Sequence, residues 1–169
     1  SSSPFAVGKH DKIRLRMLTH DAVKYKVPFI YVNQVGGNDD LVFDGNSTVI
    51  NAQGKLIAQA AAFEEDLMVV DLENPAVQAQ PRVYTPVETF HKALLVGLRD
   101  YVKKCGFKKV VIGLSGGIDS AVTAALAVQS LGNDNVVGVL MPSQFSSQGS
   151  IDDAVKLARN LEIAHKIIP

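Results

Sequence analysis

The segment from Gly113 to Ser120, with the sequence Gly-Leu-Ser-Gly-Gly-Ile-Asp-Ser, has residue types that could bind a chain of phosphates. Adjacent glycines carry no side chain, so the backbone can turn tightly and its N–H groups can approach an anion. Ser115 and Ser120 add hydroxyl donors. A helix that follows the glycines would add the partial positive charge of its N-terminus. These features favour a phosphate chain as the ligand.

Asp119 places a carboxylate beside the predicted phosphates. Two anionic groups repel each other unless a cation lies between them, and Mg²⁺ commonly bridges carboxylate and phosphate oxygens. We therefore predict that Asp119 is a magnesium ligand. The alternative is a plain strand-to-helix turn in which Asp119 only stabilises the helix dipole.

The loop lacks the signatures of two common nucleotide-binding motifs. A Walker A loop needs Gly-Lys followed by Ser or Thr, and no lysine stands in this loop. A Rossmann fingerprint needs Gly-x-Gly-x-x-Gly, and the glycines here are spaced differently.

Helices and strands alternate through the second half of the chain. A capping box at Thr85, Pro86 and Glu88 predicts the start of a helix, and Gly106 predicts its end. The expected apolar face of this helix holds Val87, Phe90, Leu94, Leu98, Tyr101 and Cys105. We predict buried strands over 109–114 and 136–140, and a third strand over 164–168. We predict helices over 120–131 and after Ser150 as N-cap, with Asp153 at the third helical position. This order predicts an α/β fold with a doubly wound parallel sheet, which binds ligands beyond the carboxyl ends of its strands.

The first half of the chain is predicted to be mostly β structure with one helix. The pattern favours a helix over 12–26, a glycine-rich loop over 33–40, and strands over 29–32, 41–43, 48–50, 55–61 and 67–72. Prolines and weak periodicity after residue 73 indicate a linker. We therefore expect a partial domain over 1–74, a linker over 75–86 and a second partial domain over 87–169.

Composition excludes several classes of protein. Lys plus Arg and Asp plus Glu are 17 each, and this zero balance argues against a nucleic-acid-binding protein. No apolar run approaches the roughly 18 residues of a membrane helix. The single cysteine, Cys105, excludes an internal disulfide, and we expect it in the core of a protein from the reducing cytoplasm. The chain begins without Met and ends as a strand is starting, so we expect a fragment of a longer polypeptide.

Several segments resemble known families. The loop Ser115-Gly116-Gly117-Ile118-Asp119-Ser120 resembles the pyrophosphate loop of ATP pyrophosphatases, and the segment from Met141 to Ala154 resembles the corresponding region of NAD synthetases. Residues 31–45, together with Ser3-Pro4-Phe5 and Gly8-Lys9, are similar to the nitrilase-like glutaminase domain of glutamine-dependent NAD synthetases. The pairing of both halves in this order indicates that family.

The resemblance implies the end of a nitrilase-like α-β-β-α domain followed by the start of a synthetase domain. It implies an enzyme that uses ATP and Mg²⁺ to adenylate nicotinic acid adenine dinucleotide and amidates it with ammonia from glutamine, as a homo-oligomer. The implied ATP-binding residues are Gly113, Leu114, Ser115, Gly116, Gly117, Ile118, Asp119 and Ser120, with Asp119 at the metal; Ser3 and Lys9 match positions that contact glutamine. No catalytic residue is assigned, because the glutaminase Glu, Lys and Cys are expected upstream of this chain.

Some alternatives stay open at this point. The enzyme could be another ATP pyrophosphatase amidotransferase, such as GMP synthetase, or this chain could bind a nucleotide without turnover. Lys9 could instead belong to a solvated basic face with His10, Lys12, Arg14 and Arg16. Cys105 is rejected as a nucleophile, because a helix C-terminus disfavours a thiolate.

Overall fold

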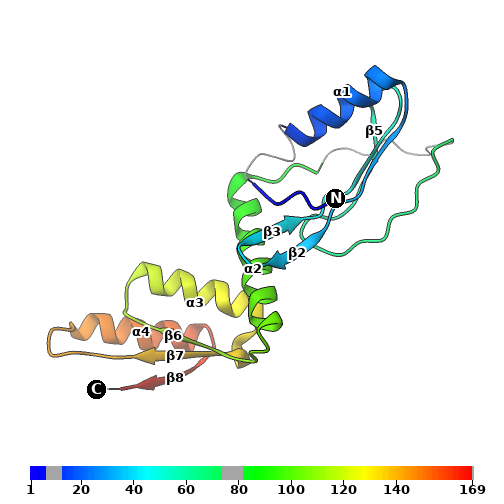
Figure 1. The fold of residues 1–169 in the computed structure, drawn as a ribbon. Helices are drawn as coiled ribbons and strands as arrows, with labels where there is room; N and C mark the ends of the chain where they lie inside the picture. Colours follow the sequence, from blue (N-terminus) through cyan, green and yellow to red (C-terminus); the bar gives the residue numbers. More distant parts are fainter. Residues whose placement is uncertain (7–12, 74–81, 169) are drawn as a thin grey trace. The chain divides into compact units, whose positions relative to one another are not determined.

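The computed structural model describes residues 1–6, 13–73 and 82–168 (Figure 1). The chain divides into two compact units, Ser1–Gly97 and Leu98–Pro169, and the boundary falls within helix α2, Pro86–Lys104. Each unit has its own sheet and its own apolar core. Among the described residues, no helix is both long enough and apolar enough to cross a membrane.

The first unit combines helix α1 and the first part of α2 with two small antiparallel sheets. Helix α1 spans Leu15–Tyr25. The first sheet has three strands in the order β1 (Phe29–Tyr31), β4 (Thr48–Ile50) and β5 (Leu56–Gln59). The second is a hairpin of β2 (Val35–Asn38) and β3 (Leu41–Asp44). A small core of Ala62, Phe63, Ala93 and Val96 packs beneath the hairpin residue Val42.

Two expectations for the first unit are wrong. The predicted loop over 33–40 contains strand β2, in which Gly36 and Gly37 pair with Phe43 and Val42. Glycines weaken a strand, but here the apolar partner strand and a left-handed Asp39 (φ +49°) close the hairpin. The predicted strand over 67–72 is absent, and Leu67 and Val69 are 93% and 94% exposed. The described residues give this segment no neighbouring strand with which to pair.

The capping box at the start of α2 is confirmed. The Thr85 hydroxyl accepts a hydrogen bond from the Glu88 N–H at 3.2 Å, and the Glu88 carboxylate accepts one from the Thr85 N–H at 2.7 Å. Hydrogen bonding to the Glu88 carboxylate, first from the Thr85 N–H and then from the Thr85 side chain, favours its charged form and lowers the pKa of Glu88. Gly106 ends the helix as predicted, with φ +78° and a bond from its N–H to the Lys103 carbonyl.

The predicted apolar face of α2 is wrong except at Leu98, which packs against the core of the second unit. The helix buries Ala93, Val96 and Val102, whereas Val87, Phe90, Leu94 and Tyr101 are each more than half exposed. Cys105 is exposed, so its expected place in the core is also wrong. Ala93 and Val96 belong to the core of the first unit, whereas Leu98 packs against the core of the second, so the buried residues of α2 do not form one continuous stripe.

The second unit is a parallel α/β structure, and the expected mixed α/β class is confirmed. Strands β6 (Val110–Gly113), β7 (Val136–Leu140) and β8 (Ala164–Ile167) lie in this order and are all parallel. Helix α3 (Ile118–Leu131) connects the first pair, and α4 (Gln148–Asn160) connects the second. The core forms where Val136 and Leu140 of β7 meet Ala124 and Ala127 of α3 and alanines of α4.

Both helix starts in this unit differ from expectation by two residues or more. Helix α3 begins at Ile118 rather than near Ser120, so Asp119 lies in its first turn. Helix α4 begins at Gln148, and its N-cap is Ser147 rather than Ser150. The Ser147 hydroxyl accepts the Ser150 N–H at 3.1 Å, which is the bond that defines a cap.

Candidate functional site

The predicted phosphate loop lies between the carboxyl end of β6 and the N-terminus of α3. Leu114 anchors its start, because this residue is 4% exposed and its N–H donates to the Val139 carbonyl of β7 at 2.8 Å. Ser115, Gly117 and Asp119 are exposed after this anchor. The loop is therefore held to the sheet at one end, and these three residues are open to solvent.

Gly116 can only be a glycine in this structure. Its φ is +79°, a conformation that residues with a side chain rarely adopt. A Cβ on Gly116 would also lie 2.3 Å from the carbonyl oxygen of Ser150 and 2.8 Å from its Cα. The loop backbone thus packs directly against the first turn of α4. A Cβ on Gly117 would meet only the Ser115 hydroxyl, at 3.4 Å.

The two serine hydroxyls of the loop bond to each other and to the loop backbone. Ser120 Oγ donates to the Gly117 carbonyl at 3.0 Å and accepts the Ser115 N–H at 3.2 Å. The two hydroxyl oxygens are 3.1 Å apart, and Ser115 Oγ accepts the Gly117 N–H at 3.3 Å. The single hydroxyl hydrogen of Ser120 is donated to the Gly117 carbonyl, so Ser115 must be the donor in the bond between the two hydroxyls. Both serines therefore brace the loop.

Backbone N–H groups remain as donors for a ligand. The first N–H groups of any α-helix have no acceptor within the helix, and those of α3 begin at Ile118 and Asp119. They lie next to Gly116 and Gly117, where the chain carries no side chains. The arrangement suits a chain of phosphate oxygens that accepts several backbone hydrogen bonds at a helix N-terminus.

The carboxylate of Asp119 is exposed and makes no hydrogen bond or ion pair within the described part of the chain. No cluster of three or more His, Cys, Asp or Glu side chains lies around it among those residues. A single carboxylate fits Mg²⁺, which keeps several waters and commonly takes its other oxygens from substrate phosphates. The exposed carboxylate of Asp119 therefore fits the predicted role of a magnesium ligand.

Of the two predicted glutamine contacts, the structure describes Ser3, and Lys9 lies outside the described residues. Ser3 is held beside strand β1 by the side chain of Asn33. The Ser3 N–H donates to Asn33 Oδ1 at 3.0 Å, and Asn33 Nδ2 donates to the Ser3 carbonyl at 3.1 Å. The Ser3 hydroxyl lies 3.4 Å from Nη2 of Arg14.

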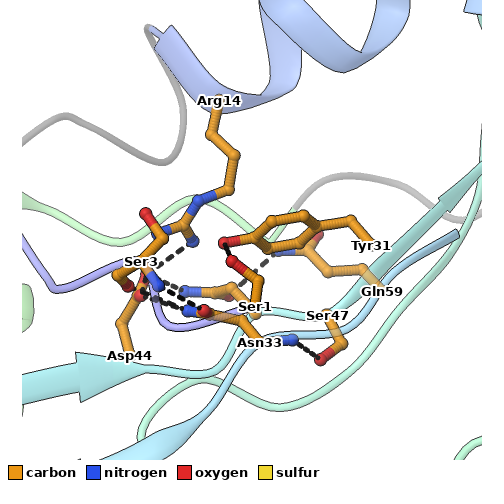
Figure 2. Close-up of polar contacts among 9 residues, drawn as sticks. Ser1, Ser3, Arg14, Tyr31, Asn33, Asp44, Ser47 and Gln59 are labelled. Atoms are coloured by element: carbon orange, nitrogen blue, oxygen red, sulfur yellow. Dashed lines mark hydrogen bonds and ion pairs between the residues drawn. The ribbon is translucent and has the colours of Figure 1, made fainter. Parts of the chain in front are cut away.

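Next to Ser3 lies a buried polar cluster that our sequence analysis missed (Figure 2). Its centre is Asp44, which is 2% exposed. Arg14 donates to both carboxylate oxygens, at 3.0 and 3.1 Å. Asn33 and Asn46 each donate one further bond, at 3.2 and 3.0 Å. Gln59 extends the cluster by donating to Asn46 Oδ1 at 3.2 Å.

The cluster corrects the alternative in which Arg14 belongs to a solvated basic face. Arg14 is 6% exposed and forms a buried ion pair with Asp44. A bidentate arginine–carboxylate pair is among the strongest polar contacts in proteins. The signal in the sequence was weak, because Asp44 precedes a turn glycine and Arg14 stands among other basic residues.

Comparison with known proteins assigns the two halves to two families. Residues 1–82 match the carbon-nitrogen hydrolase family, and residues 90–169 match the NAD synthase family. A glutamine-dependent NAD(+) synthetase from Synechocystis is 48% identical over all of this chain and 31% of its own length. One from Thermotoga maritima is 43% identical over all of this chain and 35% of its own length.

A solved structure agrees with these matches. The glutamine-dependent NAD(+) synthetase of Acinetobacter baumannii, in complex with adenosine diphosphate, is 40% identical, with a TM-score of 0.89 over 98% of this chain and 32% of its own. The chain thus combines a carbon-nitrogen hydrolase part with the start of an NAD synthase domain. It belongs to the glutamine-dependent NAD(+) synthetase family and spans about a third of the length of the relatives it matches.

Proposed function

We propose that this chain is the part of a glutamine-dependent NAD synthetase that carries the pyrophosphate loop and one side of the glutamine site. The observation that carries the proposal is the loop over 113–120, where exposed backbone N–H groups and an unpaired Asp119 lie at one helix N-terminus. The relative that was solved with adenosine diphosphate supports a nucleotide as the ligand.

The reaction that fits this loop is the transfer of AMP to a carboxylate. An oxygen of the nicotinic acid carboxylate attacks the α-phosphorus of ATP, the bond between the α- and β-phosphates breaks, and pyrophosphate leaves. Ammonia then attacks the activated acyl carbon, loses a proton and displaces AMP, which gives the amide. Activation is needed because a free carboxylate is a poor acyl donor, whereas AMP is a good leaving group.

The loop contributes by binding the pyrophosphate part of ATP. The backbone N–H groups of Ile118 and Asp119 lie where they could donate to its oxygens. Such hydrogen bonds are strongest where negative charge develops during the reaction. Gly116 keeps this backbone close to α4, and the Ser115–Ser120 bonds hold its curvature. When bound, Mg²⁺ would neutralise part of the phosphate charge, and Asp119 is the residue of this loop that would hold it.

The first unit would contribute to ammonia supply. Ser3 offers a hydroxyl, and Lys9 a cation, for the α-carboxylate of glutamine. We expect the groups that hydrolyse glutamine outside this chain, and we do not assign that role to Cys105, which follows the last residue of α2. A cytoplasmic setting, homo-oligomer formation and the absence of nucleic-acid and membrane partners remain predictions from the sequence.

A product assay on the complete polypeptide that contains this chain tests the proposal. With ATP, Mg²⁺, nicotinic acid adenine dinucleotide and glutamine, we expect NAD, AMP, pyrophosphate and glutamate in equal amounts. Formation of ADP and phosphate would contradict adenylation. Amidation of xanthosine monophosphate instead of the dinucleotide would assign the chain to a GMP synthetase. The isolated 169-residue chain should bind ATP or ADP and release no ammonia from glutamine.

A further inference from the structure

Ser3 belongs to a segment without regular secondary structure, yet its backbone is fixed. Residues 1–5 run beside β1 and the β2–β3 hairpin, and the Phe5 N–H donates to the Val42 carbonyl at 2.7 Å. Among the residues that the structure describes, no backbone group bonds to the N–H or the carbonyl of Ser3. The carboxamide of Asn33 does so instead, because it accepts from the Ser3 N–H and donates to the Ser3 carbonyl.

The orientation of this carboxamide is determined by Asp44. Asn33 Nδ2 donates to Asp44 Oδ1 at 3.2 Å, and only the NH₂ side of an amide can face a carboxylate. Its Oδ1 must therefore point at the Ser3 N–H. Arg14 prevents Asp44 from turning, since it binds both carboxylate oxygens, and the Asn33 backbone N–H donates to Ser47 Oγ at 3.0 Å.

The hydroxyl of Ser3 has its donor capacity left for a ligand. Arg14 Nη2 is a donor only, so Ser3 Oγ accepts in that contact. Within the described residues the Ser3 hydroxyl has no acceptor for its own hydrogen. A serine held in this way would donate to an anionic acceptor, such as the α-carboxylate of glutamine.

We propose that Asn33 is a positioning residue of the glutamine site, which acts through Ser3 and is itself oriented by Asp44. This inference rests on the proposed function. It predicts that Asn33 affects glutamine use and leaves the use of free ammonia unaffected, although Asn33 lies in a buried structural cluster (Figure 2).

Asn46 provides a matched control. Asn33 and Asn46 are both buried, and each donates one bond to Asp44, but Asn46 makes no bond to Ser3. Asn46 also has a left-handed backbone (φ +53°), so Asn46→Ser should cost at least as much stability as Asn33→Ser. A difference in glutamine use between the two variants therefore cannot come from stability.

The experiment compares the complete polypeptide with Asn33→Ser, Asn46→Ser, Ser3→Ala and the double variant of Asn33 and Ser3. We expect Asn33→Ser to raise the KM for glutamine by about tenfold or more, because small displacements of binding groups have effects of this order. Ammonia-driven NAD formation should be nearly unchanged. Asn46→Ser should leave the KM for glutamine nearly unchanged, and the double variant should be no worse than Ser3→Ala.

An equal rise of KM in the Asn33 and Asn46 variants would overturn the inference, and so would full additivity of the Asn33 and Ser3 effects. If Asn33→Ser does not fold, Asn33→Gln serves in its place, because it keeps an amide near Asp44 and displaces it from Ser3. Glutamine use by the unsubstituted polypeptide distinguishes failure of the proposed function from failure of the inference on Asn33. If that polypeptide makes no NAD from glutamine, the proposed function and the inference both fail, whereas normal use with an unchanged Asn33 variant overturns the inference alone.

Discussion

Two aspartates, one in each unit, show how the same side chain serves opposite purposes. Asp44 is 2% exposed and accepts four hydrogen bonds, two of them from Arg14. Asp119 is exposed and has no partner among the described residues. Burial of a charge is costly unless it is paired, so Asp44 must be satisfied within the fold. Asp119 has no such requirement and remains available to a ligand.

The surroundings of the two aspartates differ in the same way. The four hydrogen bonds to the Asp44 carboxylate all come from side chains. At Asp119 the proposed site would be made by the backbone, because Gly116 and Gly117 carry no side chain and the serine hydroxyls bond within the loop. We expect substitution of Asp44 itself to change mainly stability, whereas substitution of Asp119 should change mainly activity.

The largest effect should come from Asp44→Ala. Removing the carboxylate leaves the guanidinium of Arg14 buried without its counter-ion, which typically costs about 3–5 kcal/mol. Urea denaturation of the complete polypeptide, followed by a probe in the first unit, should show this loss. Asp119→Ala is the control, since substitution of an exposed and unpaired side chain usually changes stability by about 0.5 kcal/mol or less. Equal losses of stability in the two variants would contradict the conclusion that only Asp44 contributes to the stability of the fold.

Asp119→Asn should have the next largest effect, and on activity. The amide keeps the shape of the side chain and much of its capping ability but removes the charge that would hold Mg²⁺. We expect near-normal folding, with AMP and pyrophosphate formation reduced about 10²-fold or more, which is roughly 2.7 kcal/mol of barrier. Asp134→Asn, in the turn after α3, is the control. If the Asp119 variant kept the parent rate and the same magnesium dependence, Asp119 would not be a metal ligand and would only stabilise the dipole of α3.

A smaller effect is expected from Gly116→Ala. A left-handed alanine costs about 1–2 kcal/mol, and its Cβ would press on the Ser150 backbone. The loop or α4 must shift, so the KM for ATP should rise while the first unit remains intact. Gly117→Ala is the matched control, because Gly117 has φ −91° and its Cβ would meet only the Ser115 hydroxyl at 3.4 Å. If both alanines had the same effect, the contact with α4 would not matter for binding.

The loop could be predicted from the sequence because its signal is local. The glycines, the hydroxyls and the following helix that indicate the loop all lie within eight residues. The capping box of α2 is equally local, and it was confirmed. The cluster at Asp44 could not be predicted, because Arg14 and Asp44 are 30 residues apart and meet only through the tertiary fold.

The predictions that were wrong concern features that depend on tertiary contacts or on details that the local sequence does not distinguish. Strand β2 depends on its partner β3, which offset the low strand propensity of Gly36 and Gly37. Exposure of Cys105 and of the large residues on α2 depends on which face of the helix packs, and periodicity alone favoured the wrong face. The cap of α4 was misplaced by three residues because Ser146, Ser147 and Ser150 are alike in sequence and only the bond to Ser147 distinguishes them.

The smallest effect should be that of Thr85→Ala, which tests a contact that is local and exposed. Loss of the N-cap hydroxyl should lower stability by about 1 kcal/mol, with no change in the KM for glutamine or ATP. The folded state lowers the pKa of Glu88, so the capping box stabilises the protein at neutral pH and loses this contribution as the pH falls through that lowered pKa. The stability difference between the parent and Glu88→Gln should therefore shrink in acid, as thermal denaturation at several pH values would measure. A difference that stayed constant from neutral pH to acid would mean that the charge of Glu88 contributes nothing to the cap.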